Sequence, residues 1–179
     1  MKKIIHICIF IFLFFGCNRN SNIIPIKENL NGFLGISWED NINNSIILLE
    51  EKEYNINLYE NGNILAKGNF SGYDSNIDLY YFNGKFYNAF VKIVDYNPIP
   101  GYYFEVFNEF KLLLSEKYGY PNITPKETEE NYFAWYFENN CIIELYFNND
   151  LKHISINYMN YTINEERMEM EKNIRIKDL

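Results

Sequence analysis

Few residues in this 179-residue chain are of the types that nucleophilic or metal chemistry requires. Outside the first seventeen residues there is one histidine, His153, and one cysteine, Cys141. These two do not make a Cys–His pair, a Ser–His–Asp triad or a zinc site with the usual spacing. Cys141 begins an apolar strand pattern, which indicates a buried small side chain. His153 shares a predicted strand face with Ser155 and Asn157, which indicates a solvated imidazole.

Paired carboxylates are the remaining route to catalysis, because two acidic side chains in one cleft can perform acid–base hydrolysis. The candidates lie mostly on predicted helix faces or strand ends, where charges are usually solvated: Glu50, Glu51, Glu53, Glu129, Glu130 and Glu138. No nucleotide-binding or metalloprotease motif occurs. The sequence therefore predicts no catalytic residue, no metal and no cofactor. A carboxylate hydrolase ranks last among the functions considered.

The first seventeen residues have the pattern of a secretory signal. Lys2 and Lys3 precede an apolar run over residues 4–15, which Gly16 and Cys17 follow. The run is shorter than the roughly 20 residues with which a helix spans the hydrocarbon core. We expect residues 1–16 to be a signal peptide; the alternatives are an ordinary secretory signal in which Cys17 occurs by chance, and an uncleaved anchor.

The junction at Gly16 and Cys17 resembles a bacterial lipoprotein signal, in which a small residue precedes the cysteine that is lipidated. Phe14 and Phe15 depart from the residues usual upstream of this junction. The resemblance implies that Cys17 becomes the first residue and carries several acyl chains, which together anchor the protein in a membrane. Asn18 is not the aspartate that favours inner-membrane retention in enteric bacteria. The expected location is the bacterial cell envelope, lipid-anchored, with the outer membrane favoured.

The chain is acidic and rich enough in apolar residues to fold. Its net charge is −8, and loss of Lys2 and Lys3 with the signal makes it −10. An acidic surface cannot neutralise phosphates, so no nucleic acid is expected as a partner. Hydrophobic residues make up 47% of the chain, which is enough for a core. Residues 17–31 are polar and aperiodic and are expected to form a flexible tether.

A helix followed by three strands is predicted in the first half of the domain. Ser37 precedes a helical pattern that ends near Tyr54, with Ile42, Ile46 and Leu49 on one face. Strand patterns then cover residues 64–70, 77–82 and 86–94. Asn83 and Gly84 between the last two strands predict a tight hairpin turn, since both types tolerate a positive φ.

The same order of elements is predicted in the second half. A helix over residues 103–118 carries a stripe of Phe107, Phe110 and Leu114, flanked by Val106 and Leu113, and ends at Gly119 and Pro121. Strand patterns follow at residues 129–138, 141–147 and 151–159. The last segment, 163–179, is charged and weakly periodic, and we expect it to be a surface helix.

Short strings in the two halves correspond at a shift of 65 or 66 residues. Residues 48–52 match 113–117, and residues 78–81 match 144–147. We therefore predict an α+β domain over residues 32–162, built from two helix-plus-three-strand repeats at about 33–98 and 99–160. The helices should cover one sheet face. The pattern leaves open whether the strands form one six-stranded sheet or two three-stranded sheets.

The stretch Gly35-Ile36-Ser37-Trp38 resembles the opening of a set of small secreted bacterial proteins. Their helix end, Lys-Tyr-Gly-x-Pro, has its counterpart at residues 117–121, and their aromatic strand has its counterpart at residues 133–137. Ser37 and Glu39 stand where proline and glycine are usual. More distantly, the plan resembles outer-membrane assembly lipoproteins and the β-lactamase inhibitor protein. The resemblance implies a fold and an envelope location, and it supplies no catalytic residue.

Aromatic residues are the remaining candidates for function, since the chain has 16 Tyr, 15 Phe and 2 Trp. Tyr80, Tyr132, Tyr136 and Tyr146 fall on the predicted outer faces of strands and could form a binding surface. The first hypothesis is a lipid-anchored, non-catalytic binding or assembly module with an envelope protein as partner. The second is a secreted or surface inhibitor or ligand-capturing protein.

Overall fold

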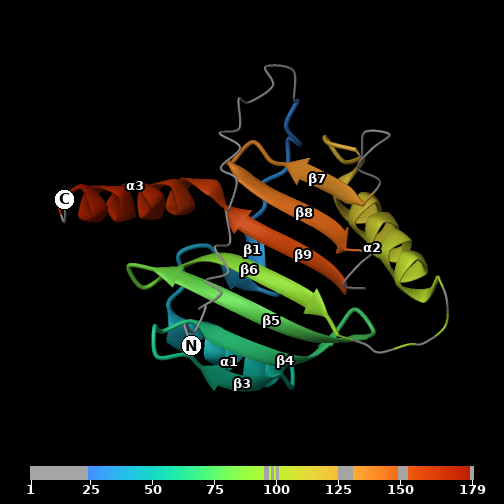
Figure 1. The fold of residues 1–179 in the computed structure, drawn as a ribbon, viewed down its shortest axis with the longest axis horizontal. Coiled ribbons are helices and arrows are strands. Elements are labelled where there is room, and N and C mark those ends of the chain that lie inside the picture. The colour runs from blue at the N-terminus through green and yellow to red at the C-terminus, as the bar shows by residue number, and fades with distance from the viewer. Residues whose placement is uncertain are drawn as a thin grey trace, which may run out of the picture.

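Three helices and a seven-stranded antiparallel sheet, with a small separate hairpin, make up an α+β fold (Figure 1). The computed structural model describes residues 24–94, 97, 99, 101–124, 131–148 and 153–177. The helices are α1 (Ile42–Glu51), α2 (Tyr102–Tyr118) and α3 (Tyr161–Lys177), and the hairpin pairs β1 (Gly32–Phe33) with β2 (Ile36–Ser37). The sheet consists of β3 (Asn55–Leu58), β4 (Ile64–Phe70), β5 (Tyr73–Phe82), β6 (Lys85–Ile93), β7 (Tyr132–Tyr136), β8 (Cys141–Asn148) and β9 (His153–Asn160). The predicted signal peptide and Cys17 lie outside the described residues.

One continuous sheet joins the two halves of the chain. Its strand order is β3-β4-β5-β6-β9-β8-β7, so each half forms a meander and the two meanders meet where β6 pairs with β9. This finding settles the question that the sequence left open. The sheet has seven strands rather than the expected six, because the first half contributes the additional edge strand β3.

A row of apolar side chains crosses the middle of the sheet on one face, which we call the inner face. The register places Ile77, Val91, Ile156, Leu145 and Phe133 side by side on five adjacent strands. All five are buried. The helices α1 and α2 and the hairpin pack into the same core cluster as this row. On α2, the Phe107 ring lies 5.7 Å from the Phe133 ring and 5.8 Å from the Phe147 ring.

The N-cap of helix α1 lies four residues after the predicted cap, so the assignment of Ser37 as the helix start was wrong. The N-cap is Asn41, whose side chain accepts a hydrogen bond from the Asn44 backbone N–H. Ser37 instead belongs to β2, and its backbone N–H donates to the Asp40 carboxylate at 2.8 Å. A single cap signal of this kind does not separate a helix start from a preceding turn, because in both a backbone N–H donates to a side chain three positions away.

Most other predicted elements are confirmed with small shifts at their ends. Strand β4 has the predicted bounds, and Asn83 and Gly84 form the predicted turn with φ values of 50° and 76°. Helix α2 begins one residue early and ends as predicted at Gly119, which has a φ of 82°. Strand β3 was missed. Its side chains are mostly exposed and polar, so it shows no apolar alternation.

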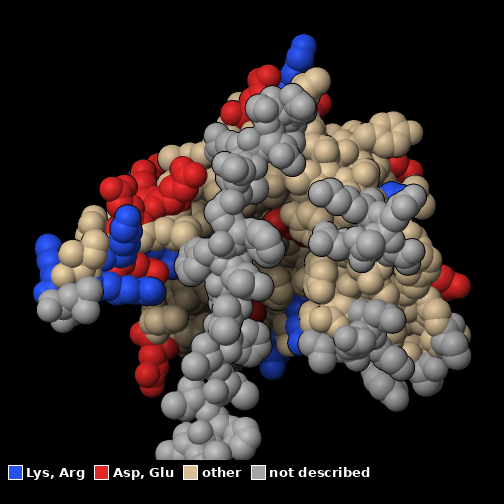
Figure 2. All heavy atoms as spheres, turned by 45° about the horizontal axis from the view of Figure 1, so that its top comes forward, with Lys and Arg blue, Asp and Glu red and all other residues tan. Residues whose placement is uncertain are grey.

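The charged tail forms the helix α3, which projects away from the body of the protein (Figure 1). Ile163, near its start, is its one buried residue. Figure 2 shows side chains of both signs gathered on this helix, where Arg167 and Arg175 lie within ion-pair distance of Glu171. Among the described residues, no helix has the length and apolar character needed to cross a membrane.

The hairpin covers the inner face between α1 and α2, and the segment before it is also packed. Ile26 pairs with Phe137 in a parallel bridge beside the end of β7. Leu30 is buried and its carbonyl accepts a hydrogen bond from the Asn139 side chain. Residues 24–31 fall within the expected flexible tether. Their contacts through Ile26 and Leu30 instead hold them against the second half of the chain.

Candidate functional site

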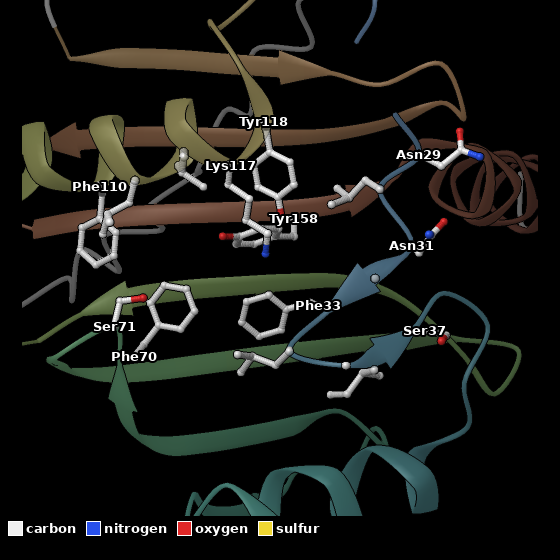
Figure 3. A pocket seen from close by; sticks show the side chains of 17 residues that line it. Asn29, Asn31, Phe33, Ser37, Phe70, Ser71, Phe110, Lys117, Tyr118 and Tyr158 are labelled. Atoms are coloured by element: carbon white, nitrogen blue, oxygen red, sulfur yellow. The ribbon is translucent and has the colours of Figure 1, made fainter. Parts of the chain in front are cut away.

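A groove with a volume of about 580 Å³ lies between α2 and the β1–β2 hairpin on the inner side of the sheet (Figure 3). Residues 29–37 form one wall and residues of α2 form the other. Phe70 and Ser71 at the end of β4 and Tyr158 on β9 complete the lining. The groove therefore lies where the two halves of the chain meet.

Four aromatic rings in contact form the floor of the groove. Tyr158 lies 4.8 Å from Phe33, Phe33 lies 5.8 Å from Phe70, and Phe70 lies 6.0 Å from Phe110, measured between ring centroids. All four side chains are buried. We call Tyr158, Phe33, Phe70 and Phe110 the aromatic row. These spacings are those of favourable aromatic pairs, so the row makes a stable apolar surface.

The wall from α2 follows directly from helix periodicity. Phe110, Leu113, Leu114, Lys117 and Tyr118 are spaced by three or four residues and therefore share one helix face. Leu114 is buried under the helix, whereas Leu113 remains 42% exposed at the edge. The buried side of the predicted apolar stripe therefore packs into the core, and the exposed edge of the stripe lines the groove.

The opposite wall depends on a tight hairpin that directs Phe33 into the groove. Phe33 pairs with Ile36, and Gly32 precedes it with a φ of 146°. A Cβ atom at Gly32 would lie 1.9 Å from the Ile36 carbonyl oxygen, so the backbones can approach this closely only at a glycine. This hairpin was not predicted from the sequence. The pair of glycines at 32 and 35 around Phe33 is the signal that could have found it.

Lys117 carries the one charge among the described residues that line the groove. Its ammonium lies 5.0 Å from the centre of the Tyr118 ring, within the range of a cation–π contact. Figure 3 shows the Lys117 and Tyr118 side chains extending together from α2 toward Tyr158. The apolar groove therefore has a positive charge at the Tyr158 end of the aromatic row.

The Tyr158 hydroxyl remains protonated at neutral pH. Burial, together with the neighbouring Tyr118, raises the pKa of Tyr158 above its ordinary value. A phenol in this state can donate a hydrogen bond and does not add a negative charge to the groove. The electrostatic character of this end is consequently set by Lys117.

The four tyrosines predicted to form a binding surface all lie on the outer face of the sheet, but they do not form one patch. Tyr132 and Tyr146 are direct cross-strand neighbours on β7 and β8. Tyr136 lies at the other end of β7, and Tyr80 lies on β5, with β6 and β9 between it and β8. Tyr146 is exposed, whereas the other three are half-buried. Sequence alternation identified their face correctly and could not identify their separation across the sheet.

A chain of hydrogen bonds crosses the outer face between β6 and β7. Asn88 donates to Asn157 at 2.5 Å, and Asn157 donates to the Glu144 carboxylate at 2.8 Å. Tyr132 donates to the other oxygen of Glu144 at 2.7 Å. Burial and the Glu144 charge raise the pKa of Tyr132. This arrangement satisfies polar groups within the sheet, so Tyr132 has a structural role there.

The two candidate chemical residues lie on opposite faces of the sheet. Cys141 is buried on the inner face, and burial raises the pKa of its thiol to about 12. His153 lies on the outer face, and burial together with Lys92 lowers the pKa of its imidazole. His153 pairs with Asn148 at the far end of β8 from Cys141. The two side chains therefore cannot act together.

The acidic candidates are dispersed. Glu50, Glu51, Glu53 and Glu138 are exposed, and Glu129 and Glu130 lie outside the described residues. Within the described ranges, no three histidine, cysteine or acidic side chains are placed to hold a metal ion. The groove is the arrangement best suited to a ligand, and its lining offers binding contacts rather than acid–base groups.

Comparison of the chain with family models, curated proteins and solved structures finds no match. The functional assignment therefore rests on the residues and their geometry.

Proposed function

We propose that the protein is a lipid-anchored, non-catalytic binding module of the bacterial cell envelope that holds an apolar ligand in the groove. The observation that carries this proposal is the groove itself, about 580 Å³ with a floor of four aromatic rings. Ligand sites commonly have volumes of about 300–1,000 Å³ and mainly apolar linings with a few polar groups. Burial of an apolar ligand on these rings would drive binding.

The predicted anchor would hold the domain by a defined edge. Ile24 is seven positions after Cys17, which gives a maximum reach of about 24 Å. The Asn122 side chain donates to the Ile24 carbonyl, and Ile26 pairs beside the end of β7. We infer that lipid on Cys17 would keep this edge of the domain near the membrane surface, where apolar ligands and envelope proteins are concentrated.

We further infer that the domain arose by duplication of a helix-plus-meander unit. In each half a helix precedes an antiparallel meander, of four strands (β3–β6) in the first half and of three described strands (β7–β9) in the second, and the last strands, β6 and β9, are neighbours in the sheet. The 65- or 66-residue shift between matching strings supports the same relation. Strand β3 has no counterpart among the described strands of the second half. The groove would then be a product of the junction between two copies.

Binding of the neutral dye Nile red tests the proposed function. The dye should bind the unlipidated protein and fluoresce, since the aromatic row offers it an apolar surface. Leu113→Asp places a charge in the groove wall and should weaken binding at least fivefold. Leu112→Asp is the matched control, since Leu112 is 60% exposed, adjacent on the same helix and not part of the lining.

Equal binding by both variants would refute the groove as the site. Circular dichroism of both variants establishes that the fold is retained.

A further inference from the structure

We propose that the ligand of the groove is a single-chain amphiphile with a carboxylate head, such as a long-chain fatty acid. Its chain would lie along the aromatic row and its carboxylate would pair with Lys117. This inference rests on the proposed function and names the chemical class that the same groove selects.

The charge at the groove is the first argument. Lys117 is exposed, and no carboxylate of the described residues pairs with it, because the described ion pairs belong to Lys85, Arg167 and Arg175. No acidic side chain occurs among the described lining residues. The whole chain is strongly acidic, with a net charge of −8. A cation left unpaired at an apolar groove, on a protein of opposite net charge, is complementary to an anionic head group.

The shape of the apolar surface is the second argument. The rings of the aromatic row follow one another from Tyr158 through Phe33 and Phe70 to Phe110. Rings that contact one another in succession match one extended chain better than a compact ligand. A volume of about 580 Å³ is in the range for one drug-sized ligand. We therefore commit to a single acyl chain and not to a two-chain phospholipid.

The hydrogen-bond donors at the charged end are the third argument. Tyr118 and Tyr158 belong to the lining beside Lys117 (Figure 3). A phenol is already protonated at neutral pH, and burial raises the pKa of Tyr158 further, so its hydroxyl can donate a hydrogen bond. A carboxylate accepts several such bonds, whereas an alcohol head gains no charge-assisted contact. The head group should therefore change the affinity measurably.

Displacement of Nile red by a matched pair of amphiphiles tests the inference. Dodecanoate and dodecanol have equal chain lengths, so their relative affinity reports the head group. With the unlipidated protein carrying Cys17→Ser, dodecanoate should displace the dye at about fivefold lower concentration than dodecanol. Lys117→Gln should reduce this ratio to about one. Lys111→Gln is the control, because Lys111 lies on the same helix over the Phe133 ring and does not line the groove.

A shorter chain and a different head group complete the test. Decanoate should bind up to about fourfold more weakly per CH₂ removed, because each CH₂ contributes burial on the rings. Dodecyl phosphate should not exceed dodecanoate in affinity. If it does, the groove selects a phosphate head and the proposal is overturned.

The experiment distinguishes failure of the proposed function from failure of the carboxylate inference. Absence of Nile red binding would refute the proposed function as well. Nile red binding with equal affinity for dodecanoate and dodecanol would leave the proposed function intact and refute the carboxylate inference alone.

Discussion

The position of Phe33 in the aromatic row depends on the glycine before it. Gly32 has a φ of 146°, and its backbone lies so close to Ile36 that no side chain fits. Gly35, in the same hairpin, has a φ of 88°, but nothing lies within 4 Å of a Cβ atom built on it. Both glycines therefore have a positive φ, but only at Gly32 would an added Cβ atom collide with a neighbouring residue.

Gly32→Ala should destabilise the protein by about 3 kcal/mol, since the added methyl group displaces the hairpin and with it Phe33. Gly35→Ala should cost about 1 kcal/mol, because only the backbone conformation is strained. Urea unfolding of both variants measures the difference. Equal losses of stability would show that the close approach of Gly32 to Ile36 does not constrain the hairpin.

Sequence periodicity identified the residues of the groove that lie in long elements. The stripe with Phe110 and Leu114 was predicted from helical spacing, and Tyr158 lies within the predicted strand over residues 151–159. Phe33, by contrast, was not predicted to belong to any helix or strand. Strands of two residues show no alternation, so their hydrogen-bond partners and inward side chains cannot be inferred from local pattern.

At the scale of elements, sequence patterns predicted the helices and strands correctly where buried positions repeat regularly. They failed for the edge strand of the sheet and for the start of the first helix. The strand β4 and the helix α2 present regular buried positions, and their predicted bounds were nearly those observed. Strand β3 pairs with β4 along one edge and buries little, so its sequence resembles a loop. The start of α1 was misplaced because two consecutive turns carry similar capping residues.

The projecting part of α3 should contribute little to the stability of the domain. Beyond Arg167, every described residue of this helix is exposed, and its ion pairs are at the surface. Deletion of residues 168–179 should therefore change the free energy of unfolding by less than about 0.5 kcal/mol. Ile163→Ala, by contrast, removes a side chain that is 4% exposed and should cost about 2 kcal/mol.

Urea unfolding of the truncated and substituted proteins compares the two effects. A larger loss from the truncation than from the single substitution would mean that the helix end has a stabilising partner.

At the scale of the whole molecule, the decisive contact is nonlocal. The register of β6 with β9 joins residues that are more than 60 positions apart, as in the pairing of Val91 with Ile156. The apolar alternation of β6 or of β9 does not specify which strand lies beside it. Each strand is apolar on one face, and each could equally form the edge of a separate three- or four-stranded sheet. The groove arises from this junction together with the hairpin above it. Its existence therefore could not be read from either half alone.

The predicted anchor makes the location of the whole protein depend on one side chain. Cys17→Ala removes the acceptor for lipid, and the acyl chains that would hold the domain at the membrane are lost. We expect this variant to move from the membrane fraction to the soluble fraction of fractionated cells. Cys8→Ala is the matched control, since Cys8 lies upstream in the predicted signal and should leave the distribution unchanged. Membrane retention of Cys17→Ala would instead identify the uncleaved apolar segment as the anchor, and would separate envelope location from lipidation.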